Sequence, residues 1–199
     1  MAITFDASRK IFKLDTPSTS YAFAVHEAGY LFHLYYGAYL PDDNLLSMLD
    51  RGMFSSFCPD FPHYVATGVS PDVTPSEYSV AGTGDFRVSA LQIRNKNGDV
   101  SPAIRYVSHR ILEKKPALCG MPALRDENGD SETLEVTTRD AATGAVVKLY
   151  YTVYQDMPVM TRSVVVENDS DAAMDLERVY SACLELPTYD YDMVHLYGK

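Results

Sequence analysis

The chain has 199 residues, of which 46% are hydrophobic and 22% are charged, and its formal net charge is −10 at pH 7. This composition is typical of one large or two small globular domains and excludes a disordered chain. The acidic balance and the lack of an apolar run of about 18 residues exclude a nucleic-acid groove and a membrane span, so neither nucleic acid nor a membrane is expected as a partner.

Short runs with alternating apolar and polar residues, separated by turn signals such as Asn97-Gly98, predict an all-β protein. The predicted strands are residues 10–14, 20–25, 30–36, 89–94, 103–112, 132–138, 147–154, 159–166 and 174–186. Strands 30–36 and 159–166 are rich enough in apolar residues to be covered on both faces. Helical spacing is limited to one short turn within residues 42–48. The pattern predicts a large antiparallel two-sheet β-sandwich.

Residues 50–85 form a long irregular segment that interrupts this strand pattern. The segment is rich in proline and glycine and also carries aromatic residues: Phe54, Phe57, Phe61, Tyr64 and Tyr78. A long irregular stretch inside a compact domain is usually functional or disordered, and the aromatic content argues against disorder. We therefore predict an ordered loop that packs on another surface, including one outside the chain.

No nucleophile elbow or glycine-rich phosphate loop is present, and most of the 27 acidic residues lie in turns, where solvated surface charge is expected. The 15 tyrosines with no tryptophan either fill pleated strand positions or form sugar-stacking and interface surfaces. Both interpretations stay open for Tyr64 and Tyr78. His33 lies in an apolar run and is interpreted as a hydrogen-bonded core histidine.

The spacing of the cysteines and histidines bears on the cellular location of the protein and on whether it binds a metal ion. Cys58, Cys119 and Cys183 are far apart in the sequence, which predicts reduced thiols in a cytoplasmic protein. Asp6 and Arg9 lie where a secretory signal would need an apolar run. Neither the cysteines nor the 5 histidines show the paired spacing of a zinc site, so no metal and no cofactor are expected.

Several segments in order resemble bacterial family 36 glycoside hydrolases, the large α-galactosidases. The matching segments are Gly29-Tyr30-Leu31-Phe32-His33-Leu34-Tyr35-Tyr36-Gly37, Glu77-Tyr78 with Asp85-Phe86-Arg87, Lys115 through Pro122, Leu149 through Val153, and His195-Leu196-Tyr197-Gly198. Ser79 departs from the family pattern, which has proline there. The order and end-to-end coverage make the resemblance specific.

The resemblance implies that residues 1–199 are the N-terminal β-supersandwich domain of a longer enzyme, ending before the rest of the sandwich and the catalytic (β/α)8 barrel. The two catalytic aspartates belong to that barrel, so no catalytic residue is expected in this chain. The implied reaction is retaining hydrolysis of terminal α-galactosides of the raffinose and melibiose type. Members are commonly homotetramers in which a loop reaches the neighbouring active site. The family's Leu-Asp-Arg matches Leu49-Asp50-Arg51, which implies that Asp50 is a substrate ligand.

Two alternatives to this function remain. The first is a free-standing carbohydrate-binding module, against which the absence of tryptophan counts, because such modules usually present an aromatic platform. The second is α-N-acetylgalactosaminidase activity in the parent enzyme, because similar scaffolds can host it. The residues that would decide between the two sugars are expected to lie in the barrel.

Overall fold

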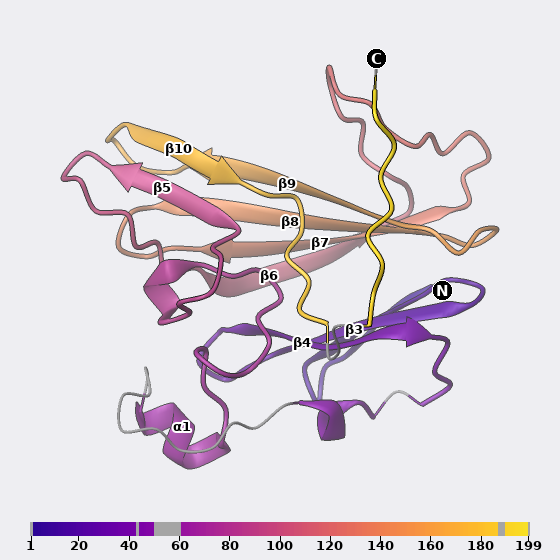
Figure 1. Ribbon diagram of the computed structural model, residues 1–199, viewed down its shortest axis with the longest axis horizontal. Coiled ribbons are helices and arrows are strands. Elements are labelled where there is room, and N and C mark those ends of the chain that lie inside the picture. Colours follow the sequence, from indigo (N-terminus) through magenta and orange to yellow (C-terminus); the bar gives the residue numbers. More distant parts are fainter. Residues whose placement is uncertain (1, 43, 50–60, 187–189, 199) are drawn as a thin grey trace.

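The computed structural model describes residues 2–42, 44–49, 61–186 and 190–198, and its regular structure is almost entirely β (Figure 1). The elements in chain order are β1 (Ile3–Asp6), β2 (Ile11–Asp15), β3 (Thr19–Val25), β4 (Leu31–Ala38), the 3-10 turn η1 (Leu46–Met48), α1 (Phe61–Thr67), the 3-10 turn η2 (Ala81–Thr83), β5 (Leu91–Asn95), β6 (Arg105–Leu112), β7 (Ser131–Arg139), β8 (Ala145–Tyr154), β9 (Met160–Asn168) and β10 (Met174–Val179).

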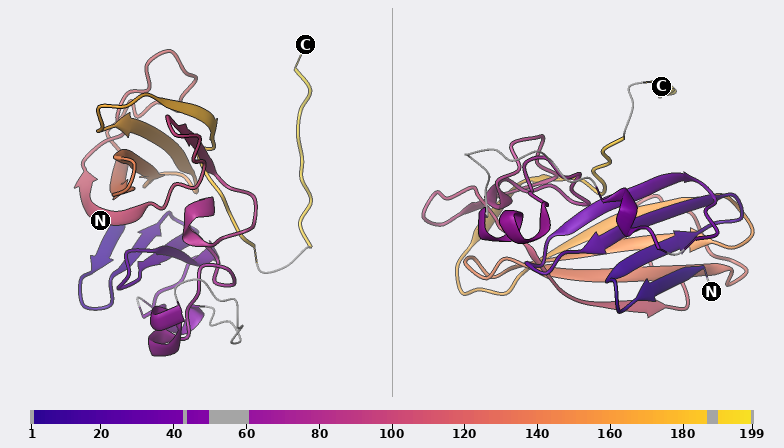
Figure 2. Two further views of the ribbon diagram at one scale, coloured as in Figure 1. Left: turned by 90° about the vertical axis from the view of Figure 1, so that its left-hand side faces the viewer. Right: turned by 90° about the horizontal axis from the view of Figure 1, so that it is seen from below.

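Two four-stranded antiparallel sheets lie face to face, as Figure 2 shows from two sides. One sheet has the order β1-β2-β3-β4, and the other has the order β6-β7-β8-β9. β5 and β10 pair antiparallel as a separate two-stranded ribbon (Figure 1). The predicted all-β sandwich is therefore confirmed, with the ribbon as an addition that the sequence did not predict.

The core lies between the two sheets, and alternation along the strands explains which residues reach it. On β3, Tyr21, Phe23 and Val25 point into the core, and on β8 the same is true of Leu149 and Tyr151. The Phe23 and Tyr151 rings stack across the sandwich with centroids 5.0 Å apart. Burying an aromatic side chain of this kind contributes roughly 1.5–3 kcal/mol.

The other face of β3 is also covered, because its small residues allow close packing. Ala22 and Ala24 pack with Leu34 of β4 and with Leu45, which directly precedes η1. The predicted helical turn within residues 42–48 is confirmed as η1. This turn holds the chain against the outer face of the first sheet just before residues 50–60.

Three predictions about individual elements were wrong. The strand predicted over residues 174–186 ends at Val179, because β5 begins at Leu91 and offers no ladder partner beyond the bond from Tyr180 N to Ala90 O. β9 is an edge strand without a fully buried residue, so it is not covered on both faces among the described residues. The segment 50–85 contains α1, which the sequence did not predict, while residues 50–60 lie outside the described part.

Within the described ranges, no helix is both long and apolar enough to cross a bilayer.

Candidate functional site

A buried carboxylate, Glu77, lies between the two sheets and connects them. The hydroxyls of Tyr21 and Tyr151 donate hydrogen bonds to it at 2.7 and 2.8 Å. Arg162 Nη1 donates to Glu77 Oε1 at 2.9 Å, and His33 Nδ1 lies 3.2 Å from Glu77 Oε2. Glu77 is 0% exposed. One side chain therefore ties β3 and β4 of the first sheet to β8 and β9 of the second.

The charges around Glu77 explain why it is ionised although it is buried. Burial alone would raise the pKa of Glu77, but the charge of Arg162 and hydrogen bonds from His33 and Tyr21 together lower it below its ordinary value. Burial and the nearby Glu77 charge raise the pKa of Tyr21 well above its ordinary value, so the phenol remains a donor.

Arg162 completes this buried group. Its guanidinium lies 3.9 Å from the centroid of the Tyr151 ring, a cation–π contact. Its Nε and Nη2 are buried, and neither has a hydrogen-bond partner in the described part of the chain. Because Glu77 already accepts four donors and is enclosed, the arrangement is suited to holding the sheets together and unsuited to acid–base catalysis on a ligand.

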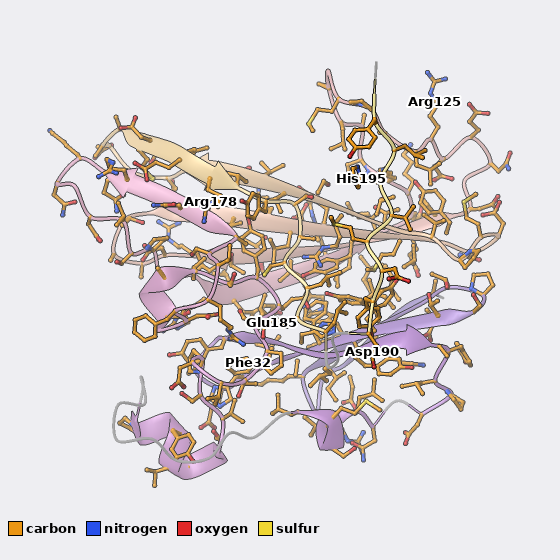
Figure 3. The ribbon with its side chains drawn as sticks, in the orientation of Figure 1. Phe32, Arg125, Arg178, Glu185, Asp190 and His195 are labelled. Atoms are coloured by element: carbon orange, nitrogen blue, oxygen red, sulfur yellow. The ribbon has the colours of Figure 1, made fainter. Side chains whose placement is uncertain are left out.

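A second charged group, centred on Arg87, holds the irregular segment in place. Arg87 Nε donates to Asp85 Oδ1 at 2.8 Å, and Nη2 donates to the carbonyls of Pro71 and Thr74 at 3.0 Å each. Nη1 pairs with Glu185 on the segment that descends from β10 toward β4 (Figure 3). The predicted Asp85-Phe86-Arg87 motif is therefore structural: it fixes residues 71–76 and 185 relative to each other.

A groove of about 670 Å³ opens beside β4, next to both charged groups. Its lining includes His33, Tyr36, Leu49, Pro75, Glu185 and Leu186. Burial raises the pKa of Glu185 above its ordinary value, against the lowering effect of Arg87. Leu49, which also lines the groove, directly precedes the predicted sugar ligand Asp50 in the sequence.

The structure resolves some of the open interpretations from the sequence. Asp50 lies outside the described residues, so its predicted role stays a prediction. Tyr78 is buried and donates a hydrogen bond to the Tyr180 carbonyl at 2.8 Å, which makes it a packing residue. His33 is the hydrogen-bonded core histidine that was predicted. Ser79 donates to the Val88 carbonyl at 2.7 Å and so helps fix the path toward β5.

The sequence did not reveal the Glu77 group as a unit. Its members are up to 141 positions apart, as between Tyr21 and Arg162, and a single sequence carries no signal that joins them. The one available hint is Arg162 itself, the one charged residue of the predicted strand 159–166, because a charge in an apolar-rich strand needs a partner if it is buried.

Residues 29–199 match the model of the glycosyl hydrolase family 36 N-terminal domain. The chain belongs to this family. α-Galactosidase AgaA of Geobacillus stearothermophilus is 36% identical over 100% of this chain. The bifunctional α-galactosidase/sucrose kinase AgaSK of Mediterraneibacter gnavus is 34% identical, also over 100% of this chain.

Solved structures of family 36 α-galactosidases share the fold. The AgaB enzyme of Geobacillus stearothermophilus superimposes with a TM-score of 0.85 at 37% identity, covering 96% of this chain and 26% of that enzyme. An AgaA variant solved in complex with raffinose gives a TM-score of 0.83 at 36% identity, covering 92% of this chain and 25% of that enzyme. The chain spans 27% of the length of AgaA and 21% of that of AgaSK.

Proposed function

We propose that this chain is the N-terminal domain of an α-galactosidase that hydrolyses terminal α-galactosides of the raffinose and melibiose type. The observation that carries the proposal is the 36% identity to AgaA over the whole of this chain, since a variant of AgaA was solved with raffinose. In this proposal the sandwich supports a catalytic barrel supplied by the rest of a family-length polypeptide. The Glu77 and Arg87 groups keep the sandwich rigid, and rigid elements position a site better than loops do.

The proposed reaction retains the anomeric configuration. One carboxylate attacks the anomeric carbon while a second protonates the leaving oxygen, and water then releases galactose. Both carboxylates belong to the barrel in the family pattern, so this chain contributes no catalytic residue. Its contribution is the segment after Leu49, where Asp50 is proposed to accept hydrogen bonds from sugar hydroxyls in a neighbouring subunit's pocket. The assembly is proposed to be a cytoplasmic homotetramer.

The proposal is tested with a polypeptide of the relatives' length that contains this chain. It is expected to release galactose from raffinose and melibiose, and NMR should detect the α-anomer first, because two inversions restore the starting configuration. Initial release of the β-anomer would contradict retention. Efficient turnover of an α-N-acetylgalactosaminide with none of raffinose would favour the other sugar specificity.

The 199-residue chain alone is expected to show no α-galactosidase turnover. Retaining hydrolysis needs two carboxyl groups about 5 Å apart across the scissile bond, and the proposal places both outside this chain. The measurement is release of nitrophenol from a nitrophenyl α-galactoside at high protein concentration. Turnover that survives removal of host enzymes, and that disappears when an acidic residue of this chain is replaced, would overturn the assignment.

A further inference from the structure

An apolar cluster at the start of β4 contacts two residues that are far apart in the sequence, Leu49 and Val69. Tyr30, Phe32 and Val69 form this cluster, called here the Phe32 cluster, and Leu49 packs against it. Leu49 is the residue directly before Asp50, and Val69 lies just after α1. The chain on either side of residues 50–68 is therefore held on the same cluster.

The Phe32 cluster is a fixed surface. Phe32 (labelled in Figure 3) is buried, and its ring centroid lies 5.7 Å from that of Tyr30. The Arg105 guanidinium lies 4.0 Å from the Tyr30 ring centroid, and Arg105 Nη2 donates to the Tyr30 hydroxyl at 3.1 Å. A side chain that packs on these rings is therefore held in a defined position.

Val69 reaches the cluster because α1 ends sharply before it. Gly68 takes a left-handed backbone conformation with a φ of 72°, and its N–H donates to the Tyr64 carbonyl at 2.7 Å, as in the αL type of helix end. His26 Nε2 lies 3.2 Å from Thr67 Oγ1 at the end of α1. These contacts fix the direction in which the chain enters Val69, which is buried.

Leu49 is held on two sides. It ends the η1 turn, where its N–H donates to the Leu46 carbonyl at 3.2 Å, and its backbone is extended. Its side chain packs against the Phe32 cluster and also against the buried cluster that contains Ala22 and Leu45. Consecutive Cα atoms are about 3.8 Å apart, so a fixed Leu49 restricts where the residue after it begins.

We propose that Leu49 and Val69 form an apolar clasp on the Phe32 cluster and that this clasp positions Asp50 for sugar binding. Leu49 is then a positioning residue, which acts through Asp50. The inference rests on the proposed function for the role of Asp50. It goes beyond that function by assigning a role to the leucine of Leu49-Asp50-Arg51 and by joining it to Val69.

The kinetic test uses Leu49→Ala in a polypeptide of the relatives' length. Its kcat/KM for raffinose is expected to fall about five- to ten-fold, because a small displacement of a substrate-binding group is costly. Leu49→Met should be close to the wild type, since a swap of similar volume keeps the apolar contact. In an Asp50→Ala background, Leu49→Ala should cause no further loss, because residues that act as one unit are not additive.

Leu46→Ala is the matched control. Leu46 is also a partly buried leucine of η1, but it packs against the Ala22 cluster and, within the described ranges, is not part of the Phe32 cluster. It should leave kcat/KM near the wild-type value. The proposal is overturned by wild-type kinetics in Leu49→Ala alongside an impaired Asp50→Ala, or by an equal loss from Leu49→Ala in both backgrounds.

Amide hydrogen exchange tests the clasp without any enzymatic activity. Exchange at Gly68 and Val69 should be at least about three-fold faster in Leu49→Ala than in the wild type or in Leu46→Ala, because opening of the clasp exposes these amides. Unchanged exchange would overturn the clasp even in a polypeptide that does not hydrolyse raffinose. Wild-type kinetics in Asp50→Ala would instead contradict the proposed sugar role of Asp50, and the exchange rates would still report on the clasp.

Discussion

Replacing Glu77 by Ala is expected to destabilise the fold by about 3–5 kcal/mol, the usual cost of removing one partner of a buried ion pair. The variant leaves the Arg162 guanidinium buried without a counter-charge and leaves the hydroxyls of Tyr21 and Tyr151 without their acceptor. The measurement is the free energy of unfolding from urea titration. For a domain with the marginal stability of natural proteins, this loss approaches complete unfolding.

Glu167→Ala is the matched control for this experiment. Glu167 also accepts from a cation on a neighbouring strand, Lys148 Nζ at 2.6 Å, but its side chain is 47% exposed. An exposed pair of this kind contributes at most about 1 kcal/mol. Equal losses in the two variants would contradict the proposed role of Glu77. Combining Glu77→Leu with Arg162→Met should recover part of the loss, because no unpaired charge then remains.

The lowered pKa of Glu77 also predicts how acid affects stability. A carboxyl whose folded pKa lies below its unfolded value stabilises the fold fully above the unfolded value, which is ordinarily 4.5 for Glu. That stabilisation is lost as pH falls from the unfolded value through the folded one. Glu77→Gln should therefore flatten the fall in unfolding free energy between about pH 6 and pH 3. If the unfolding free energy fell with pH as steeply in Glu77→Gln as in the wild type, other carboxyl groups would determine the loss of stability in acid.

Alternation and turn residues predicted most of the strands, because these signals are local. β8 was predicted to begin at residue 147 and begins at Ala145. The last residues of β3 and β6, Val25 and Leu112, are those predicted. β1 was missed because its turn to β2 contains no glycine, proline or asparagine. Instead, Asp6 accepts hydrogen bonds from Ser8 N and Arg9 N, and Lys10 takes a positive φ of 57°. Asp and Ser favour such turns through these side-chain bonds, but Asp6 and Ser8 alone are a weaker signal than the glycine and proline turns used for the other strands.

The missed features of the site share one physical origin: long separation along the chain. Glu77 contacts residues before and after it in the sequence, and only the stacking of two sheets brings Tyr21 and Tyr151 to the same carboxylate. The groove depends on residues 36 and 185 in the same way. By contrast, Asp50 was predicted as a substrate ligand from three consecutive residues that match the family's loop. Local sequence patterns therefore predicted the strands, whereas the groove and the two charged groups arise only when distant strands pack together.

Asp50→Ala is expected to lower kcat/KM for raffinose by about 10- to 150-fold in a polypeptide of the relatives' length. This range corresponds to one hydrogen bond to a charged group, which contributes roughly 1.5–3 kcal/mol. The basis is the resemblance of Leu49-Asp50-Arg51 to the Leu-Asp-Arg of the family's loop. The alternative is a surface aspartate that pairs with Arg51 or caps the loop, since acidic residues in loops are usually solvated.

Two readouts separate these possibilities for Asp50. Asp42→Ala is the matched control, because Asp42 is an exposed acid on the same connection that accepts a hydrogen bond from Asn44 N at 2.8 Å. It should leave kcat/KM unchanged. In Asp50→Ala the oligomeric state by light scattering and the Tm should also stay near the wild-type values, because the carboxylate is proposed to bind sugar and not to hold the fold. Wild-type kinetics in Asp50→Ala would show that Asp50 does not bind the sugar. A joint loss of activity and of the oligomer would assign Asp50 to subunit assembly, because replacing a residue that only contacts substrate should not separate the subunits.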